Sequence, residues 1–302
     1  MRIGVVIGNS GGYGDSVSAL VSDYERARAE GLSAVWMTQH AGFDALTLMA
    51  SWGDHDGPEL GTAVIPAQTR HPIPLAEQAL TTQALTGGRL ALGLGLAHSA
   101  TLESVYGLSP RRSVGYLADY LDTLQALLSG TKSASNETFR FTTRIGASEL
   151  PTPPPVLIAA LGPRMLQLAG ERTAGTITWM TGPRTIAEYI TPTIRAAAEA
   201  AGRAEPRVVV CLPFCVTKNR KEALDRSAQF ANYRDIPSYR AMLDREGVND
   251  PRDIAIAGGA DAVREALDEL EAGGATDVAA IPFGQPDEVA ATWELLGICT
   301  RG

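Results

Sequence analysis

Short apolar runs alternate along the chain with longer segments in which apolar residues recur every three or four positions. Apolar runs of about four to eight residues are typical of buried strands, and the longer spacing is typical of amphipathic helices. Residues 114–128 show the helical spacing most plainly, because apolar side chains step by three and four from Val114 to Leu128. The chain is therefore predicted to alternate strand and helix over most of its length.

Eight strands are predicted, and helices separate them. The predicted strands are residues 2–7, 34–37, 60–65, 89–99, 156–159, 176–179, 207–216 and 277–281. Repeated strand–helix units favour an all-parallel sheet, and eight units in 302 residues favour a (β/α)8 TIM barrel of the α/β class. We expect a single domain over residues 1–302, with insertions after the fourth and seventh strands. An open, doubly wound sheet is disfavoured because no third glycine follows Gly93 and Gly95 in the GxGxxG spacing.

Three segments are expected to depart from the plain repeat. Residues 100–112 show no clear periodicity and are predicted to be irregular, whereas residues 131–155 form an insertion with a hairpin at 138–143. A long helical region is predicted over residues 220–245, followed by a second insertion near residues 247–253.

The fourth strand carries an unusual pattern of small side chains. Three leucines alternate there with Ala91, Gly93 and Gly95, so one face of the strand is nearly bare. Glycine inside a strand indicates the close approach of another backbone or of a ligand. His98 follows where the strand should open into a loop. The pattern indicates either a floor for a flat ligand or close packing between layers of the barrel.

Charge and cysteine content exclude several classes of function. The net charge is −8 and no run of Lys or Arg stands out, so a nucleic-acid footprint is not expected. No apolar run approaches the roughly 20 residues that span a bilayer. The first strand begins at Met1 and leaves no room for a signal peptide, and three unpaired cysteines are typical of a reducing compartment. We therefore expect a cytoplasmic protein that acts on a small molecule, without a nucleic-acid or membrane partner.

Two of the four histidines fall at predicted strand ends, where a barrel builds its active site. His40 follows Gln39 after the second strand, and His98 follows the fourth. Histidine titrates near neutral pH and is the commonest general acid or base, although either residue could be a loop histidine without a role. Gln39 and His40 alone are too few ligands for zinc, so no metal site is predicted. An organic cofactor that supplies the chemistry is the remaining expectation.

Two helices are predicted to begin with the same Gly-Pro-Arg sequence, at residues 162–164 and 182–184. Proline suits the first helical position, and the free N–H groups of the first turn attract anions. Both segments are therefore candidate phosphate sites, although Gly-Pro also begins helices that bind nothing.

These residues together resemble the luciferase-like monooxygenase superfamily of flavin- and deazaflavin-dependent barrels. The resemblance covers nearly the whole chain and is carried by residues 61–64 (GTAV), 87–95 (GGRLALGLG), 159–165 (AALGPRM), and 256–258 with 273–277. Within the superfamily the chain is most similar to the branch that uses coenzyme F420, an 8-hydroxy-5-deazaflavin.

The resemblance implies hydride transfer between F420 and a small organic substrate, and a homodimer as the expected assembly. His40 falls where sugar-phosphate dehydrogenases of this branch place a catalytic histidine. Its neighbour is Gln39 where those enzymes have an aspartate, and His98 falls where they place a catalytic glutamate. These differences favour a reductase, such as one similar to methylene-tetrahydromethanopterin reductase, with His40 as the first and His98 as the second candidate for proton transfer. The resemblance also implies a non-prolyl cis peptide bond between Ala63 and Val64, against the cofactor ring.

The candidate cofactor-binding residues are Gln39, Ala63, Val64, Gly95, Ala97, Ala160, Leu161, Gly162, Pro163, Arg164, Thr181 and Gly182. Arg111 and Arg112, with Arg164 and Arg184, are candidates for the anionic tail of F420. Two other functions remain open: an FMN-dependent monooxygenase and a flavin-binding barrel without catalysis.

Overall fold

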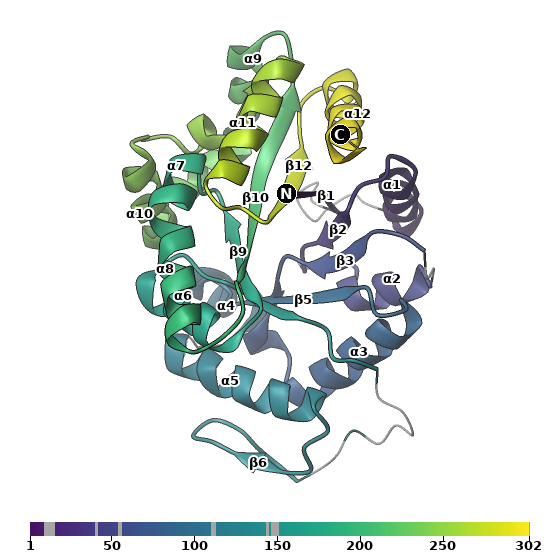
Figure 1. Ribbon diagram of the computed structural model, residues 1–302, viewed down its shortest axis with the longest axis vertical. Helices are drawn as coiled ribbons and strands as arrows, with labels where there is room; N and C mark the ends of the chain where they lie inside the picture. Colours follow the sequence, from purple (N-terminus) through teal and green to yellow (C-terminus); the bar gives the residue numbers. More distant parts are fainter. Residues whose placement is uncertain are drawn as a thin grey trace.

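The computed structural model describes residues 1–8, 16–39, 42–53, 56–109, 113–142, 145 and 151–301. Its centre is a closed barrel of eight parallel strands surrounded by helices (Figure 1). Barrel order is β1 (Arg2–Ile7), β2 (Ala34–Met37), β3 (Glu59–Thr62) continued by β4 (Ile65–Pro66), β5 (Leu90–Gly95), β8 (Val156–Ala159), β9 (Gly175–Trp179), β10 (Arg207–Val216) and β12 (Asp277–Pro282). The barrel closes because β10 pairs with both β9 and β12. The predicted TIM-barrel fold is confirmed.

Helices follow the strands as the alternating pattern predicts. Their bounds are α1 (Val17–Ala29), α2 (Ala45–Ser51), η1 (Ala67–Thr69), α3 (Pro72–Leu85), α4 (Ser99–Tyr106), α5 (Ser113–Leu128), α6 (Pro163–Arg172), α7 (Pro183–Thr185), η2 (Ile186–Ile190), α8 (Thr191–Ala200), α11 (Ala260–Ala272) and α12 (Pro286–Arg301). The prediction of an irregular segment over residues 100–112 is wrong in its first half, because α4 forms there. That helix ends at Gly107, whose left-handed backbone (φ 63°) suits a residue without a side chain.

The insertion after β10 is broken into shorter pieces than predicted. It contains α9 (Arg220–Arg226), η3 (Ala228–Asp235), α10 (Pro237–Glu246) and η4 (Pro251–Ile254), where a continuous helical region over 220–245 was expected. The break falls at Ile236, which is extended because it precedes a proline. The insertion then forms β11 (Ile256–Gly258), a strand that was not predicted and that pairs in parallel with the end of β10.

The expected hairpin is present but begins earlier in the chain. β6 (Ala134–Ser135) pairs antiparallel with β7 (Arg140–Phe141), whereas the prediction was 138–143, whose last residue lies outside the described chain. Thr138 and Phe139 form its turn, and their N–H groups donate to the Asn136 side chain at 3.1 and 2.7 Å. A side-chain cap of this kind favours a turn over a strand.

Charged residues close the N-terminal end of the barrel. Arg207 lies between Glu59 at 2.8 Å and Asp277 at 2.6 Å, and Arg2 lies 3.2 Å from Glu59. Burial opposes the charge of Arg207, but hydrogen bonds from its guanidinium to Asp277 and Glu59 raise its pKa overall. These residues begin four different strands, so they tie the barrel together at the end opposite the strand C-termini.

Above this ion cluster the barrel interior is apolar. Trp36 is fully buried there, and a Cβ built on Gly61 would lie 2.1 Å from the indole ring. Cys211 lies in the same layer, and burial raises the pKa of its thiol to about 12, so it remains protonated. Side chains thus fill the barrel interior above its N-terminal end. A ligand site is therefore expected at the C-terminal end.

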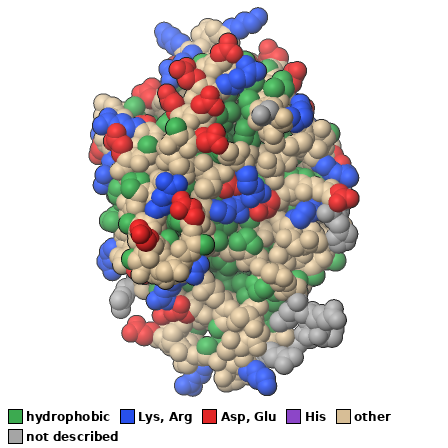
Figure 2. All heavy atoms as spheres, viewed as in Figure 1, with side chains coloured by type: hydrophobic (Ala, Val, Ile, Leu, Met, Phe, Trp, Pro, Cys, Tyr) green, Lys and Arg blue, Asp and Glu red, His purple; other side chains and the backbone are tan. Residues whose placement is uncertain are grey.

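Within the described chain, no helix is both long enough and apolar enough to cross a membrane. On the face shown in Figure 2, Lys and Arg side chains are interspersed with Asp and Glu side chains. No basic patch dominates this face.

Candidate functional site

A bulge between β3 and β4 forms the first part of the candidate site. Leu60 pairs with Leu90 below the bulge and Ile65 pairs with Leu94 above it, so this side of the ladder holds one extra residue. Thr62 bridges the gap: its hydroxyl donates to the Gly93 carbonyl and accepts from the Gly93 N–H, both at 2.8 Å. The bulge is thereby fixed to the glycine-rich strand.

The bare face of β5 is required by this bulge. A Cβ built on Gly93 would lie 1.9 Å from the Thr62 carbonyl oxygen, and one on Gly95 would lie 2.5 Å from Val64 Cγ2. The peptide bond between Ala63 and Val64 is cis, as predicted. Ala63 and Val64 are half-buried, so they and Gly95 present a small apolar surface at the C-terminal end of the barrel. Close packing therefore accounts for the glycine pattern, and the ligand floor stays a prediction.

Gln39, a predicted cofactor-binding residue, is engaged with protein groups. Its side-chain oxygen accepts from the Ala45 N–H at 3.0 Å and from Arg70 at 3.2 Å. Arg70 also forms an ion pair with Asp44, the N-cap of α2. Burial acts to raise the pKa of the Asp44 carboxyl, but hydrogen bonds from Thr47 and the Arg70 charge hold it below its ordinary value. Gln39 thus anchors the start of α2. The catalytic candidate His40 lies outside the described residues.

His98, the second catalytic candidate, lies directly after the floor. The preceding Ala97 N–H donates to the Gln68 side chain at 3.0 Å, which fixes the chain leaving β5. His98 then occupies the N-cap of α4 without capping it, and its ring meets Tyr239 edge-on with centroids 5.7 Å apart. Partial burial lowers the pKa of His98, so the neutral imidazole prevails at pH 7.

The two Gly-Pro-Arg helix starts differ in the structure. At α7 the Glu246 carboxylate accepts from the Arg184 and Thr185 N–H groups at 3.2 and 2.8 Å, and Arg184 pairs with Glu188. This start, beside the predicted residues Thr181 and Gly182, already holds an internal anion.

The α6 start is open by comparison. A Cβ built on Gly162 would meet nothing within 4 Å, and no side chain caps the helix. Arg164 is exposed and has no ion-pair partner among the described residues. Ala160 and Leu161 lead into this turn from β8, and the Ala160 carbonyl accepts from the Thr176 hydroxyl at 3.2 Å. Pro163 contributes no N–H, so the first free donor of the helix is that of Arg164.

Aromatic side chains from the β10 insertion meet others at the strand ends. The contacts run from His98 to Tyr239, Tyr233, Trp179, Phe230 and Phe283, each ring meeting the next at a centroid distance between 4.9 and 6.2 Å. We call these six residues the aromatic row. The sequence indicated only those at strand ends, because the others lie in a segment whose helical pattern gives no sign of facing the barrel mouth.

The remaining predicted residues fall outside the site or outside the described chain. Arg111 and Arg112 belong to the residues that the structure does not describe. No group of three or more His, Cys, Asp or Glu side chains suited to a metal occurs in the described part.

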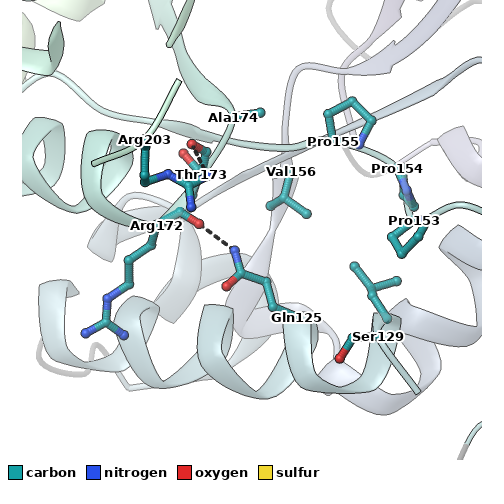
Figure 3. Close-up of a pocket in the computed structure, with 11 residues that line it drawn as sticks. Gln125, Ser129, Pro153, Pro154, Pro155, Val156, Arg172, Thr173, Ala174 and Arg203 are labelled. Carbon is teal, nitrogen blue, oxygen red and sulfur yellow. Dashed lines mark hydrogen bonds between the residues drawn. The ribbon is translucent and has the colours of Figure 1, made fainter. Parts of the chain in front are cut away.

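A pocket of about 280 Å³ lies elsewhere, between α5, α6 and the residues before β8 (Figure 3). There Gln125 donates to the Arg172 carbonyl oxygen and Arg203 donates to the Thr173 carbonyl oxygen at 3.1 Å. Val156 begins β8, so the pocket is at the barrel end opposite the candidate site.

Comparisons with known proteins show the family and the fold. The family model described as luciferase-like monooxygenase matches residues 1–293. A 5,10-methylenetetrahydromethanopterin reductase of Methanolobus tindarius is 27% identical over 256 residues, 82% of this chain and 76% of that protein. A Mycobacterium tuberculosis protein named as a coenzyme F420-dependent oxidoreductase is 27% identical over 99% of this chain and 93% of its own length. The solved structure of the coenzyme F420-dependent tetrahydromethanopterin reductase of Methanopyrus kandleri superimposes with a TM-score of 0.79, at 19% identity over 98% and 97% of the two chains.

Proposed function

The chain belongs to the luciferase-like monooxygenase family, a family of enzymes, and we propose that it transfers a hydride between coenzyme F420 and a small organic substrate. Two relatives that match most of the chain carry names that state F420 dependence or reduction of a tetrahydromethanopterin derivative. The observation that carries the proposal is the contrast between the two helix starts, since only the α6 start leaves a turn and a cation open for a phosphate.

The residues at the barrel mouth fit a planar cofactor with a phosphate. Ala63, Val64 and Gly95 form a floor without polar side chains, on which a fused ring system can lie flat. Gly162, the residue before α6, leaves open space at the start of this helix. The Arg164 N–H supplies a hydrogen-bond donor for an anion, and the Arg164 guanidinium supplies a positive charge. The bound deazaflavin would supply a carbon that accepts or releases a hydride.

The chain's own contribution is orientation and proton transfer. Burial keeps His98 neutral, so its imidazole can donate one hydrogen bond and accept another beside the floor. A group of this kind can deliver a proton to a substrate oxygen or nitrogen as the hydride arrives. His40, which follows Gln39 in the sequence, is the first candidate for this step.

Titration of the purified apoprotein with F420 and with FMN tests the proposal. We expect saturable binding of F420 at micromolar concentration, measured as a change in the fluorescence of the cofactor. The reduced complex should not consume oxygen, because a deazaflavin does not react with it as a reduced flavin does. Tight FMN binding with no response to F420 would contradict the proposal and favour the monooxygenase.

A further inference from the structure

The aromatic row reaches across the barrel mouth from one strand end to others far away in the sequence. His98 follows β5, Trp179 ends β9 and Phe283 follows β12. Tyr239 and Tyr233 join the first two, with ring centroids 5.7, 4.9 and 5.6 Å apart along the row. All of these contacts are edge-to-face, the arrangement that aromatic pairs prefer.

The part of the insertion that carries the rings, residues 226–246, is held in position at both of its ends. Near its start, Arg226 forms an ion pair with Glu288 at 2.5 Å, which ties α9 to α12. At its end, Glu246 caps α7 and accepts from the Thr185 hydroxyl at 2.6 Å. The rings are therefore carried by a segment fastened on either side, and the row is preformed.

Two of the cations that flank the tyrosines of the row are paired with neighbouring carboxylates. Arg234 pairs with Asp235, and Arg240 pairs with Asp244 at 2.9 Å. Burial raises the pKa of both tyrosines in the row, so they remain neutral at physiological pH. None of the ring contacts described for the row involves Lys or Arg.

An uncharged aromatic wall favours flat apolar ligands and disfavours anionic ones. A flat apolar ligand gains buried area and edge-to-face contacts, and the hydroxyl of Tyr239 can donate to a carbonyl. An anionic ligand would lose its hydration without meeting a cation, which is unfavourable in a largely buried setting.

We propose that the aromatic row is the substrate wall of the enzyme and that it selects uncharged aromatic substrates over anionic ones, with Tyr239 as a specificity-determining residue. This substrate assignment rests on the proposed hydride transfer, since it names the substrate class of that same site. It also separates this chain's substrate class from phosphorylated or carboxylated compounds.

Binding of a matched pair of probes tests the wall without the cofactor. The probes are 2-acetylnaphthalene, which is neutral, and 2-naphthoate, which is an anion of similar size. Each is titrated into the full-length protein while tryptophan fluorescence is followed, and Trp179→Phe identifies the part of the signal that comes from the row. Because F420 is absent, the result does not depend on whether F420 binds.

We expect wild type to bind 2-acetylnaphthalene about tenfold or more tightly than 2-naphthoate. Tyr239→Ala should weaken binding of the neutral probe by roughly 2- to 10-fold, the range of one aromatic contact. Tyr233→Arg should reverse the preference by placing a cation on the wall. Tyr189→Ala is the control, because Tyr189 lies under Arg245 and outside the row.

Equal or tighter binding of 2-naphthoate by wild type would overturn the proposal, and so would wild-type affinity for 2-acetylnaphthalene in Tyr239→Ala. The wild-type comparison holds even if a variant fails to fold. If the probes behave as expected while F420 does not bind, the proposed cofactor is wrong and the wall stands. If F420 binds and wild type shows no preference for the neutral probe, the proposed wall is wrong and the proposed cofactor stands.

Discussion

Two helices begin with the same three residues, Gly-Pro-Arg, and one distant carboxylate gives them different surroundings. The Glu246 carboxylate, at the end of α10 and 62 residues along the chain from Arg184, accepts hydrogen bonds from the N–H groups of the α7 start. The α6 start has no such neighbour and keeps its turn open. Local sequence therefore predicts both as anion sites with equal force, and only the tertiary contact distinguishes them.

His98 gives a prediction at the same scale. Its pKa lies below the ordinary value of 6.5 because of partial burial, so over the interval between these values the unfolded chain binds more protons than the folded one. Stability contributed by the neutral ring is therefore present above about pH 6.5 and is lost as the pH falls through the folded pKa. Between about pH 7.5 and pH 5, the melting temperature of wild type should fall more than that of His98→Gln. Parallel profiles for the two proteins would show that the ring is not protected from protonation.

At the scale of elements, strands were predicted closely and irregular segments were not. Four predicted strands, 2–7, 34–37, 156–159 and 207–216, have the observed bounds, because buried parallel strands carry uninterrupted apolar runs. The predicted strand 60–65 is instead split into β3 and β4 by the bulge. The insertion was misjudged because its breaks depend on Pro237 and on contacts with α7 and α12.

The β3–β4 bulge depends on one hydroxyl group. In Thr62→Val the Gly93 N–H and carbonyl both lose their partner in a buried setting, at a cost of about 1–3 kcal/mol for an unsatisfied group. We expect the free energy of unfolding in urea to fall by about 2–4 kcal/mol on this basis. The control is Thr81→Val, whose exposed hydroxyl only donates to the Glu77 carbonyl of its own helix. Equal stability of the two variants would mean that Thr62 does not fix the bulge.

Across the whole molecule, the two ends of the barrel serve different purposes. The N-terminal end holds the ion cluster around Arg207, and the C-terminal end holds the floor, the open helix start and the aromatic row. The alternating strand–helix pattern was sufficient to predict this division, since a parallel barrel places its binding loops at one end. Tyr239 contacts His98, and Glu246 caps the α7 start. Both come from an insertion whose packing against the barrel is not indicated by the hydrophobic pattern.

Removing the cation of the ion cluster should affect stability without affecting the site. In Arg207→Met, the nearly buried Asp277 and the half-buried Glu59 keep charges with less compensation, which costs about 3 kcal/mol or more. Affinity for F420 should remain within about twofold for the folded protein, because the cluster is at the opposite end of the barrel. Arg172→Met, which removes an exposed pair with Asp122, should cost under about 1 kcal/mol. Urea unfolding and cofactor titration of both variants check this separation.

The most direct test of the account is the F420 dissociation constant of two matched glycine variants. Gly162 and Gly259 each precede a helix, have similar backbone angles (φ −79° and −64°) and would carry a Cβ that meets nothing within 4 Å. Both glycines are N-caps, where Ala is less favourable than Gly, so the two Gly→Ala changes should lower stability modestly and by similar amounts. We predict that Gly162→Ala weakens F420 binding at least tenfold because the methyl group occupies the phosphate turn, whereas Gly259→Ala binds as wild type does. Wild-type affinity in Gly162→Ala would contradict the account, since the cofactor phosphate could not then lie at the start of α6.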